Sequence, residues 1–392
     1  MRTLYILLSL ALSTVMVVPV AAHAAGEECR IATSSIEAAE RIRGLTRKRP
    51  VPCFVHNADQ VRGHLQSLLA TKLPEGKLKL EEQLYKAIGL IPAEFNYAGG
   101  IIDLYVSQLG GYYDPDAQHF VMAGWIPAAV QGPIAVHELT HALQDQYFEL
   151  SSFIDLKAMP SDALLARSAL AEGDATAVMI DHARLQVGQL PIAREKNVEA
   201  VMMQNLMGAS VMPGLEHIPD SMKAMLIFPY TSGLRFVHAL LQRGGYRGVD
   251  AAFRTPPAST EEILHPEKYG QPPDFEVLED SGALAHVGEG FKVLYGDTIG
   301  EFGISALLAI GSADRPAAAR AAAGWGGDRA TLLTHGERTV LIWRLKWDTT
   351  ADAAEFVERY RAGAGGRGEV QQHDREVVFV RELHPPKPAT PA

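Results

Sequence analysis

The segment AVHELTHALQDQ, at residues 135–146, constrains the fold more strongly than any other stretch of this chain. It places His137 and His141 four positions apart, with Glu138 directly after the first histidine. On an α-helix, residues four apart lie on one face, a turn from each other, so both imidazoles can point at one position. Glu138 lies about 100° around the helix axis and borders that face. The spacing therefore predicts a helix that presents two metal-binding nitrogens with a carboxylate beside them.

A catalytic zinc centre usually takes three protein ligands and leaves a fourth position for water, so this helix needs a third ligand from elsewhere. A histidine six residues after His141 is one known solution, but Tyr147 occupies that position. The other is a glutamate from a later helix, and Glu172 in LAEGDAT is the candidate. Gly173 follows it, although glycine costs a helix interior about 1 kcal/mol relative to alanine. We expect these small residues to let the second helix approach the motif helix closely.

Hydrophobic periodicity and turn residues predict a mostly helical α+β chain. Helices are expected over residues 59–91, from Gly132-Pro133 to Tyr147, from an N-capping Ser161 to Val187, over 198–208, over 231–243 after a stop at Phe228-Pro229, and over 259–265. Strands are expected within 99–124, with a hairpin at 114–117, and residues 270–300 are expected to be loop and short elements. From about residue 329 the pattern predicts a small β-α-β lobe followed by a frayed tail.

The first 24 residues have the pattern of a secretory signal peptide. Arg2 precedes an apolar run over residues 4–18, and Ala22-His23-Ala24 offers the small residues that signal peptidase prefers. The run is shorter than the roughly 20 residues of a membrane span, so we expect cleavage after Ala24, with an uncleaved anchor as the alternative. No other stretch is expected to cross a bilayer. The sequence therefore predicts an exported chain, periplasmic or secreted.

Two cysteines remain after that cleavage, Cys29 and Cys53. In an oxidising compartment such a pair is expected to form a disulfide, worth about 3 kcal/mol for a loop of this length; two unpaired buried thiols are the alternative. The bridge would staple residues 25–60, a basic arm, to the body of the protein. The sequence leaves open whether this arm is removed as a propeptide. The net charge of −10, with scattered lysines and arginines, gives no sign of a nucleic-acid-binding surface.

The blocks HELTHALQDQ and EGDAT, taken together, resemble the gluzincin branch of the zincin metallopeptidases. More narrowly, they resemble a group of bacterial and archaeal zincin-like proteins. Weaker likenesses in GGYYDPDAQHF, PYTSGLRFV and STEEILHPEKY extend the resemblance over roughly residues 80–270; the C-terminal part of the chain has no such motif. The resemblance implies one zinc ion, Zn2+, bound by His137, His141 and Glu172, with Glu138 as general base. The spacing indicates the same roles.

The resemblance also implies a mechanism that acts on a peptide or protein substrate. Zinc would lower the pKa of a bound water toward about 7, and Glu138 would carry a proton from that water to the leaving nitrogen. Tyr230 is the candidate donor to the developing oxyanion; a tyrosine capping a core helix is the plainer alternative. Asp145 and Asp174 could orient the ligand histidines, although solvated helix carboxylates are the plainer interpretation. The strand at 119–123 could be the sheet edge along which an extended substrate lies.

We therefore divide the chain into a signal peptide at 1–24, an N-terminal arm at 25–60, a zincin-like catalytic domain with a small hairpin or sheet at 61–325, and a small C-terminal α/β lobe with a disordered tail at 326–392. The predicted function is that of an exported zinc-dependent metallopeptidase. The alternative is a non-hydrolytic, zinc-containing module that binds a peptide or cell-envelope partner through the C-terminal lobe. An intact Glu138 favours the enzyme, because a binding site needs no base.

Overall fold

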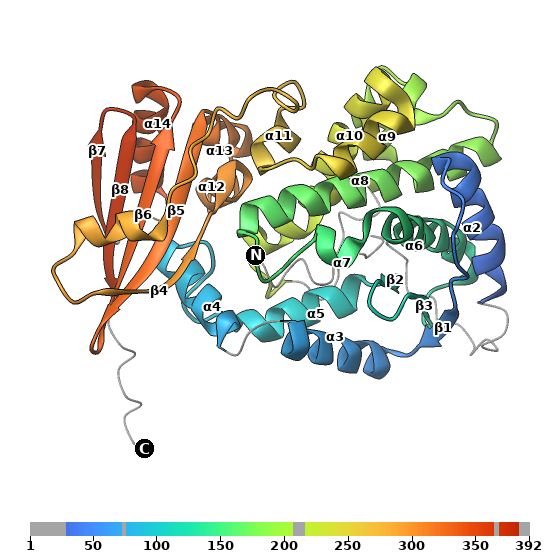
Figure 1. Ribbon diagram of the computed structural model, residues 1–392, viewed down its shortest axis with the longest axis horizontal. Helices are drawn as coiled ribbons and strands as arrows, with labels where there is room; N and C mark the ends of the chain where they lie inside the picture. Colours follow the sequence, from blue (N-terminus) through green and yellow to red (C-terminus); the bar gives the residue numbers. More distant parts are fainter. Residues whose placement is uncertain (1–28, 73–75, 207–215, 364–367, 384–392) are drawn as a thin grey trace.

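The computed structural model describes residues 29–72, 76–206, 216–363 and 368–383. The predicted signal peptide and the predicted tail lie outside these ranges. The described residues form a mostly helical α+β fold with two separate sheets, as the sequence predicts. In Figure 1 the long helix α8 (Ser161–Gln186) crosses the helical part of the molecule, with a five-stranded sheet at the left and a three-stranded sheet at the lower right.

The remaining elements fall into two regions along the chain. The first region contains α2 (Arg30–Arg43), β1 (Cys53–His56), α3 (Ala58–Lys72), α4 (Lys77–Ile88), α5 (Tyr97–Gln108), β2 (Gly111–Asp114), β3 (His119–Ala123), α6 (Ala128–Phe148), α7 (Leu150–Phe153), η2 (Ile192–Arg194), α9 (Val198–Leu206), α10 (Asp220–Arg254) and α11 (Thr260–Leu264). The second region contains η4 (Asp280–His286), β4 (Lys292–Asp297), α12 (Gly300–Leu308), α13 (Arg315–Ala322), β5 (Trp325–His335), β6 (Arg338–Trp347), α14 (Thr350–Ala362), β7 (Glu369–His373) and β8 (Glu376–Leu383).

Helices α6 and α8 carry the two predicted ligand blocks, and both lie close to their predicted positions. The predicted start of α6 at Gly132-Pro133 is wrong by about one turn, because the helix begins at Ala128 and Pro133 lies inside it. Pro127 directly precedes the helix, and its fixed φ suits a helix start. Ser161 is the first helical residue of α8 and not its N-cap. Its N–H donates to Asp297 Oδ1 at 2.8 Å, so a carboxylate from the second region satisfies this end of α8.

Residues 97–108 form helix α5, where the sequence analysis expects strands, so that prediction is wrong. The side chain of Asn96 caps this helix by accepting a hydrogen bond from the Gly99 N–H at 3.1 Å. Ile101, Leu104 and Tyr105 are fully buried, and their spacing of three and one suits a helix with one face in the core. The β-branched and glycine-rich composition of this stretch favours a strand, but the helical spacing of its buried side chains decides the structure.

Helix α10 continues past Phe228-Pro229, where the sequence predicts a stop. The prediction is wrong because the residues on both sides of the proline, Phe228 and Tyr230, are buried in the core, and this packing maintains the helix. The chain leaves helical dihedrals only at Gly245, which has a φ of 59° and a ψ of −159°. Glycine adopts a positive φ without the steric penalty of a side chain. Tyr230 and Gly233 therefore lie on one continuous helix.

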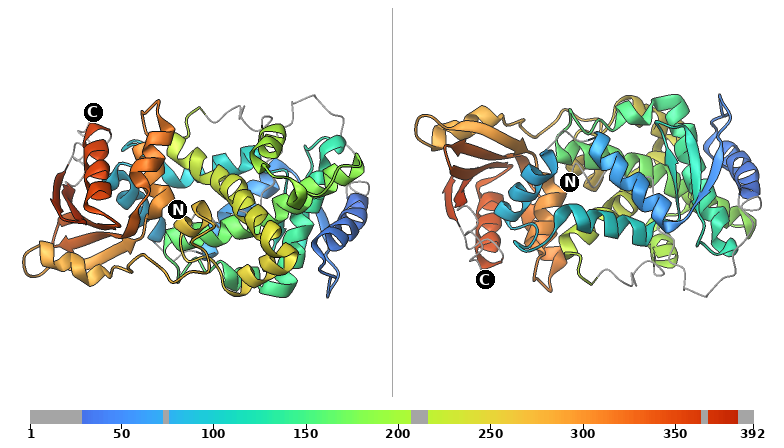
Figure 2. Two further views of the ribbon diagram at one scale, coloured as in Figure 1. Left: turned by 90° about the horizontal axis from the view of Figure 1, so that it is seen from above. Right: turned by 90° about the horizontal axis from the view of Figure 1, so that it is seen from below.

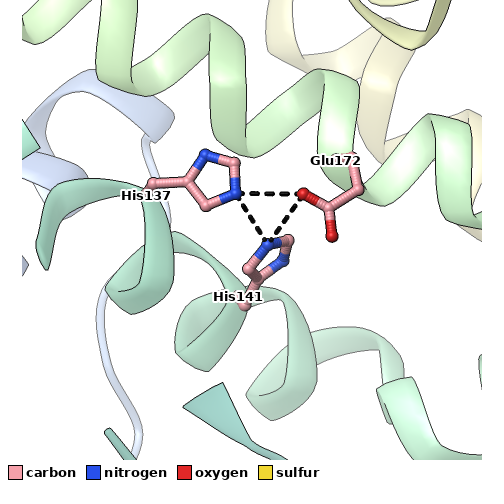
Figure 3. A group of neighbouring side chains, drawn as sticks. All are labelled: His137, His141 and Glu172. Carbon is pink, nitrogen blue, oxygen red and sulfur yellow. Dashed lines mark hydrogen bonds and ion pairs between the residues drawn. The ribbon is translucent and has the colours of Figure 1, made fainter. Parts of the chain in front are cut away.

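Helices α8 and α10 cross with their backbones in close contact at two glycines. A Cβ atom added at Gly173 would lie 2.3 Å from the carbonyl carbon of Gly233, and one added at Gly233 would lie 2.1 Å from the carbonyl oxygen of Ala169. The close approach expected at Gly173 is therefore present, but its partner is α10 and not the motif helix α6. This contact fixes the position of α8 next to α10. Glu172, the residue before Gly173, projects from α8 toward α6 (Figure 3).

The small sheet has the strand order β1-β3-β2, so β3 is its middle strand. β3 pairs in parallel with β1 and antiparallel with β2. The expectation that the strand at 119–123 is a free edge for substrate is therefore wrong, and β2 is an edge strand instead. The predicted hairpin is confirmed: Asp114 Oδ1 accepts hydrogen bonds from the N–H groups of Asp116 and Ala117, both at 2.9 Å, which stabilises the turn.

The predicted disulfide between Cys29 and Cys53 is formed, with the two Cα atoms 5.6 Å apart. It joins the residue before α2 to the first residue of β1. α2 packs against α6 and α8, so the arm is folded onto the helices that carry the two ligand blocks.

The second region is an antiparallel sheet in the order β4-β5-β6-β8-β7. The predicted strands at β6 and β8 and the helix α14 between them are confirmed, but the sheet also includes β4, β5 and β7, and it begins before residue 326. Alternate residues of β6 face opposite sides: Leu341 and Trp343 belong to the main core, whereas Val340 and Ile342 pack with Ala283 of η4. Both faces of this sheet are therefore covered over its centre.

One helix of the described part, α10, is long and apolar enough to cross a membrane. No such stretch is expected from the sequence after the signal peptide, so α10 departs from that expectation in length and composition. However, 72% of its most apolar part is buried inside the protein, which is the usual situation of a core helix.

We predict that Gly173→Ala destabilises the protein by about 2 kcal/mol or more, because the added methyl group would overlap the backbone of Gly233. The measurement is the free energy of unfolding from denaturant titration. Gly63→Ala in α3 is the control, because a Cβ there has no heavy atom within 4 Å; it should be neutral or stabilising by up to about 1 kcal/mol. Equal stabilities for Gly173→Ala and the unsubstituted protein would contradict the close crossing.

Candidate metal centre

The three predicted ligand residues meet in the interior of the protein (Figure 3). His137 Nε2 lies 3.0 Å from Glu172 Oε2, and His141 Nε2 lies 3.4 Å from the same oxygen. The two Nε2 atoms are 3.1 Å apart. None of the three residues is more than 2% exposed. The one-turn spacing on α6 and the position of Glu172 on α8 thus bring three ligand atoms to one point.

Gln144 determines which nitrogen of His141 carries a proton. Its Nε2 donates to the carbonyl oxygen of Ala171 at 3.0 Å and to Asp174 Oδ2 at 2.9 Å. Because both partners are acceptors, the amide can have only one orientation, with Oε1 toward His141 Nδ1 at 2.8 Å. Nδ1 must therefore carry the proton and donate it to this bond, so in the neutral ring Nε2 carries the free lone pair. This is the tautomer that a metal-binding histidine needs.

Three electron-pair donors so close together repel one another unless a cation lies among them, either a proton or a metal ion. The pKa shifts of the three ligand residues show how burial and their mutual interactions act on the cluster. Burial would raise the pKa of Glu172, but His141 and His137 outweigh it and hold the pKa below its ordinary value. Burial lowers the pKa of His137 despite the opposing effect of Glu172. For His141, burial would lower the pKa, but Glu172 and Gln144 raise it above the ordinary value.

Asp174 and Asp145 are buried, so the expectation that they are solvated helix carboxylates is wrong. Asp174 supports His141 through Gln144, as described above. Asp145 Oδ2 accepts a hydrogen bond from the Tyr113 hydroxyl at 2.9 Å, and burial raises the pKa of Asp145 despite this bond. Each carboxylate therefore acts on the centre through one intervening residue, Gln144 for Asp174 and Tyr113 for Asp145.

Glu138 is fully buried beside the edge strand β2. Its Oε2 accepts the backbone N–H of Tyr113 at 3.1 Å. This N–H lies on the side of β2 away from β3, so the carboxylate occupies the outer edge of the small sheet. The side chain is thus held by the backbone of β2, next to the helix turn that carries both histidines.

Tyr230 lies beside His137, as a site role would require. The two rings stack with centroids 6.0 Å apart and planes at 29°. Tyr230 is only 3% exposed and belongs to the interior of α10, so it is not a capping residue. The structure therefore brings Tyr230 next to the ligand cluster.

A cavity of about 360 Å³ opens onto the cluster, a size within the usual range of small-ligand pockets. His141 and Glu172 line it, together with Tyr112 and Tyr113 of β2. Its remaining apolar wall comes mainly from α3 and the segment around α7 and contains Leu65, Leu68, Leu150, Ile154 and Leu156. The cavity gives a small molecule or an extended chain a path to one side of the ligand cluster.

Sequence reasoning missed Gln144 and Tyr113. Gln144 lies three residues after His141, hence on the same helix face, so the pattern HALQ contained a usable signal. Tyr113 acts through its backbone and through a contact with Asp145 that is 32 residues away in sequence, and no local pattern indicates it.

Among the residues that the structure describes, one other group of side chains could in principle bind a cation. Glu261, Asp274 and Asp348 have carboxylate oxygens close together. The ammonium group of Lys268 lies among them, at 2.5 Å from Glu261, 2.9 Å from Asp274 and 3.9 Å from Asp348. A side-chain cation therefore already pairs with all three carboxylates of this group.

Comparison with known protein families finds a likeness in the second region alone. Residues 292–386 are similar to a family described as a domain of unknown function, DUF8575. The matched range starts at the first residue of β4 and includes the whole five-stranded sheet, and it contains none of the ligand cluster. No curated protein matches the chain, and no solved structure matches it.

We predict that Gln144→Met weakens zinc binding by about 10- to 100-fold, because His141 Nδ1 loses the acceptor that orients the ring. The dissociation constant would be measured by competition with a chromogenic chelator. Gln131→Met is the matched control: it removes a buried amide from the same helix, where Gln131 Nε2 donates to the Ile126 carbonyl at 2.9 Å, away from the cluster. The account of His141 fails if the two variants bind zinc equally well.

Proposed function

We propose that this chain is an exported zinc-dependent metallopeptidase with a zincin-like catalytic domain. The observation that carries the proposal is the convergence of His137, His141 and Glu172 on one buried point. Two imidazoles and a carboxylate are a common ligand set for catalytic zinc. Export is supported by the signal-peptide pattern of the first 24 residues and is consistent with the Cys29–Cys53 disulfide.

The donor set fits one divalent ion and not a larger cofactor. Three lone pairs face one another within 3.4 Å, and the proton on His141 Nδ1 is committed to Gln144. The cavity reaches only one side of the cluster, through His141 and Glu172. This supports a centre with three protein ligands and one position open to water or substrate, which distinguishes catalytic from closed structural zinc sites.

When bound, zinc supplies a Lewis acid that acidifies water and polarises a carbonyl group. The chain itself would move the protons. The Glu138 carboxylate would accept a proton as water attacks the peptide carbonyl and deliver it to the leaving nitrogen. The Tyr113 N–H fixes Oε2 of that carboxylate. Tyr230, next to His137, is the candidate hydrogen-bond donor to the oxyanion.

The substrate would approach along the cavity between β2, α3 and the segment around α7. Its leucine and isoleucine side chains offer apolar contacts to a substrate beside the ligand cluster. β2 replaces β3 as the candidate edge for an extended peptide, because β2 has a strand partner on one side only. A peptide or protein substrate therefore remains the proposed partner.

We predict that Glu138→Gln lowers kcat for cleavage of a mixed peptide library by about 10²- to 10⁴-fold and leaves one zinc ion per chain. Glutamine keeps an oxygen for the Tyr113 N–H but cannot accept the proton. Glu355→Gln, at an exposed position of α14, is the control and should cleave like the unsubstituted protein. Undiminished cleavage by Glu138→Gln would contradict its role as base. Zinc binding with no cleavage by the unsubstituted protein would favour the alternative, a zinc-containing binding module.

A further inference from the structure

The N-terminal arm brings two arginines, Arg43 and Arg49, to the candidate metal centre. Both belong to the segment 29–56, which the Cys29–Cys53 disulfide closes. Each arginine pairs with one of the buried aspartates described above. The two pairs lead to different members of the HELTH block, and they do so through separate side chains.

Arg43, the last residue of α2, leads to the ligand His141. Its Nε donates to Asp174 Oδ2 at 2.8 Å, with both side chains fully buried. The same oxygen accepts Gln144 Nε2 at 2.9 Å, and Gln144 Oε1 accepts His141 Nδ1–H at 2.8 Å. Arg43 Nη2 also donates to Asp250 of α10 at 2.7 Å. Arg43 therefore holds the Asp174 carboxylate in place. That carboxylate holds the Gln144 amide, which in turn orients His141.

Arg49 leads to the proposed base Glu138. Its Nη2 donates to Asp145 Oδ2 at 2.7 Å. The same oxygen accepts the Tyr113 hydroxyl at 2.9 Å, and the Tyr113 N–H donates to Glu138 Oε2 at 3.1 Å. Without a cation beside it, Asp145 would be a charge in a largely apolar setting, which is costly. Arg49 thus stabilises the partner that holds Tyr113 and β2 against α6.

The arm also forms hydrogen bonds with Gln146 of α6. The N–H groups of Lys48 and Arg49 both donate to Gln146 Oε1, at 2.5 and 3.0 Å, and Lys48 Nζ donates to the Gln146 carbonyl at 2.8 Å. The arm is therefore hydrogen-bonded to α6 at Gln146, just over one turn beyond the ligand His141.

We propose that residues 29–56 brace the metal centre, with Arg43 as a positioning residue for the ligand His141 and Arg49 as a positioning residue for Glu138. This inference rests on the proposed function, since it assigns separate tasks to the two arginines: metal binding depends on Arg43, and turnover depends on Arg49.

The test compares Arg43→Gln, Arg49→Gln and a matched control, Arg47→Gln, in the full exported chain. Arg47 lies between the other two in sequence, and its side chain is 37% exposed with Nε 3.7 Å from Glu40 Oε1. Its backbone N–H donates to the same oxygen at 2.6 Å, a bond that the substitution keeps. Three quantities are measured: the zinc dissociation constant, the visible spectrum of the Co2+-substituted protein, and kcat with KM on a peptide library.

We expect Arg43→Gln to weaken zinc binding by about 10- to 100-fold and to alter the Co2+ spectrum. Arg49→Gln should bind zinc normally and lower kcat by about 10- to 100-fold with KM unchanged, as expected for a misplaced base. Arg47→Gln should match the unsubstituted protein in all three. Because Arg43 is buried, Arg43→Lys is a second variant; it keeps the charge but cannot reach both aspartates with a planar fork, so its zinc affinity should also fall.

Zinc affinity and Co2+ spectrum unchanged in both Arg43 variants, or kcat unchanged in Arg49→Gln, would overturn the brace and leave the metallopeptidase proposal standing. If Arg43→Gln does not fold, Arg43→Lys decides in the same way. An unsubstituted protein that binds no zinc would refute the metal centre itself, so the two failures are distinguishable.

Discussion

The mutual repulsion of three buried electron-pair donors is the constraint on which the rest of this structure depends. Nε2 of His137, Nε2 of His141 and Oε2 of Glu172 lie within 3.4 Å of one another in an interior that offers little water. Such an arrangement persists only if a cation is shared among them and if the surrounding fold prevents the side chains from turning away. Two features of the fold prevent the side chains from turning away. The crossing of α8 with α10 fixes the backbone that carries Glu172, and the hydrogen bond to Gln144 fixes the ring of His141.

The fold distributes this task over distant parts of the chain. Gly173 and Gly233 let α8 and α10 touch, so that Glu172 cannot drift from α6. β2 contributes a backbone N–H to Glu138, and the arm contributes cations to the two aspartates behind the site. The centre is therefore preorganised before any ligand binds, which lowers the cost of assembling it during reaction. Among the described residues, the second region supplies no member of the ligand cluster, although Asp297 of β4 satisfies the start of α8.

Local geometry explains what could be predicted from the sequence. The spacing of His137 and His141 fixes their common face as soon as the segment is a helix, and the disulfide follows from two cysteines in an exported chain. Glu172 was predictable because a glutamate from a following helix is a common third ligand, and the small residues around it in LAEGDAT suggested a close helix crossing. By contrast, Arg43 reaches Asp174 across 131 residues of sequence, and no pattern marks that contact. The strands expected within 99–124 are absent from 99–108, where the spacing of the buried Ile101, Leu104 and Tyr105 favours a helix over the β-branched composition. The pattern does not indicate β5, whose first residues are glycine-rich.

The most direct test of the central claim is anomalous X-ray diffraction at the zinc absorption edge from crystals of the zinc-loaded protein. The account predicts a single strong peak at about 2.0–2.2 Å from Nε2 of His137, Nε2 of His141 and one carboxylate oxygen of Glu172. A peak elsewhere, for example at the acidic group around Lys268, would contradict it. So would a zinc ion held by the two histidines with the Glu172 side chain turned away.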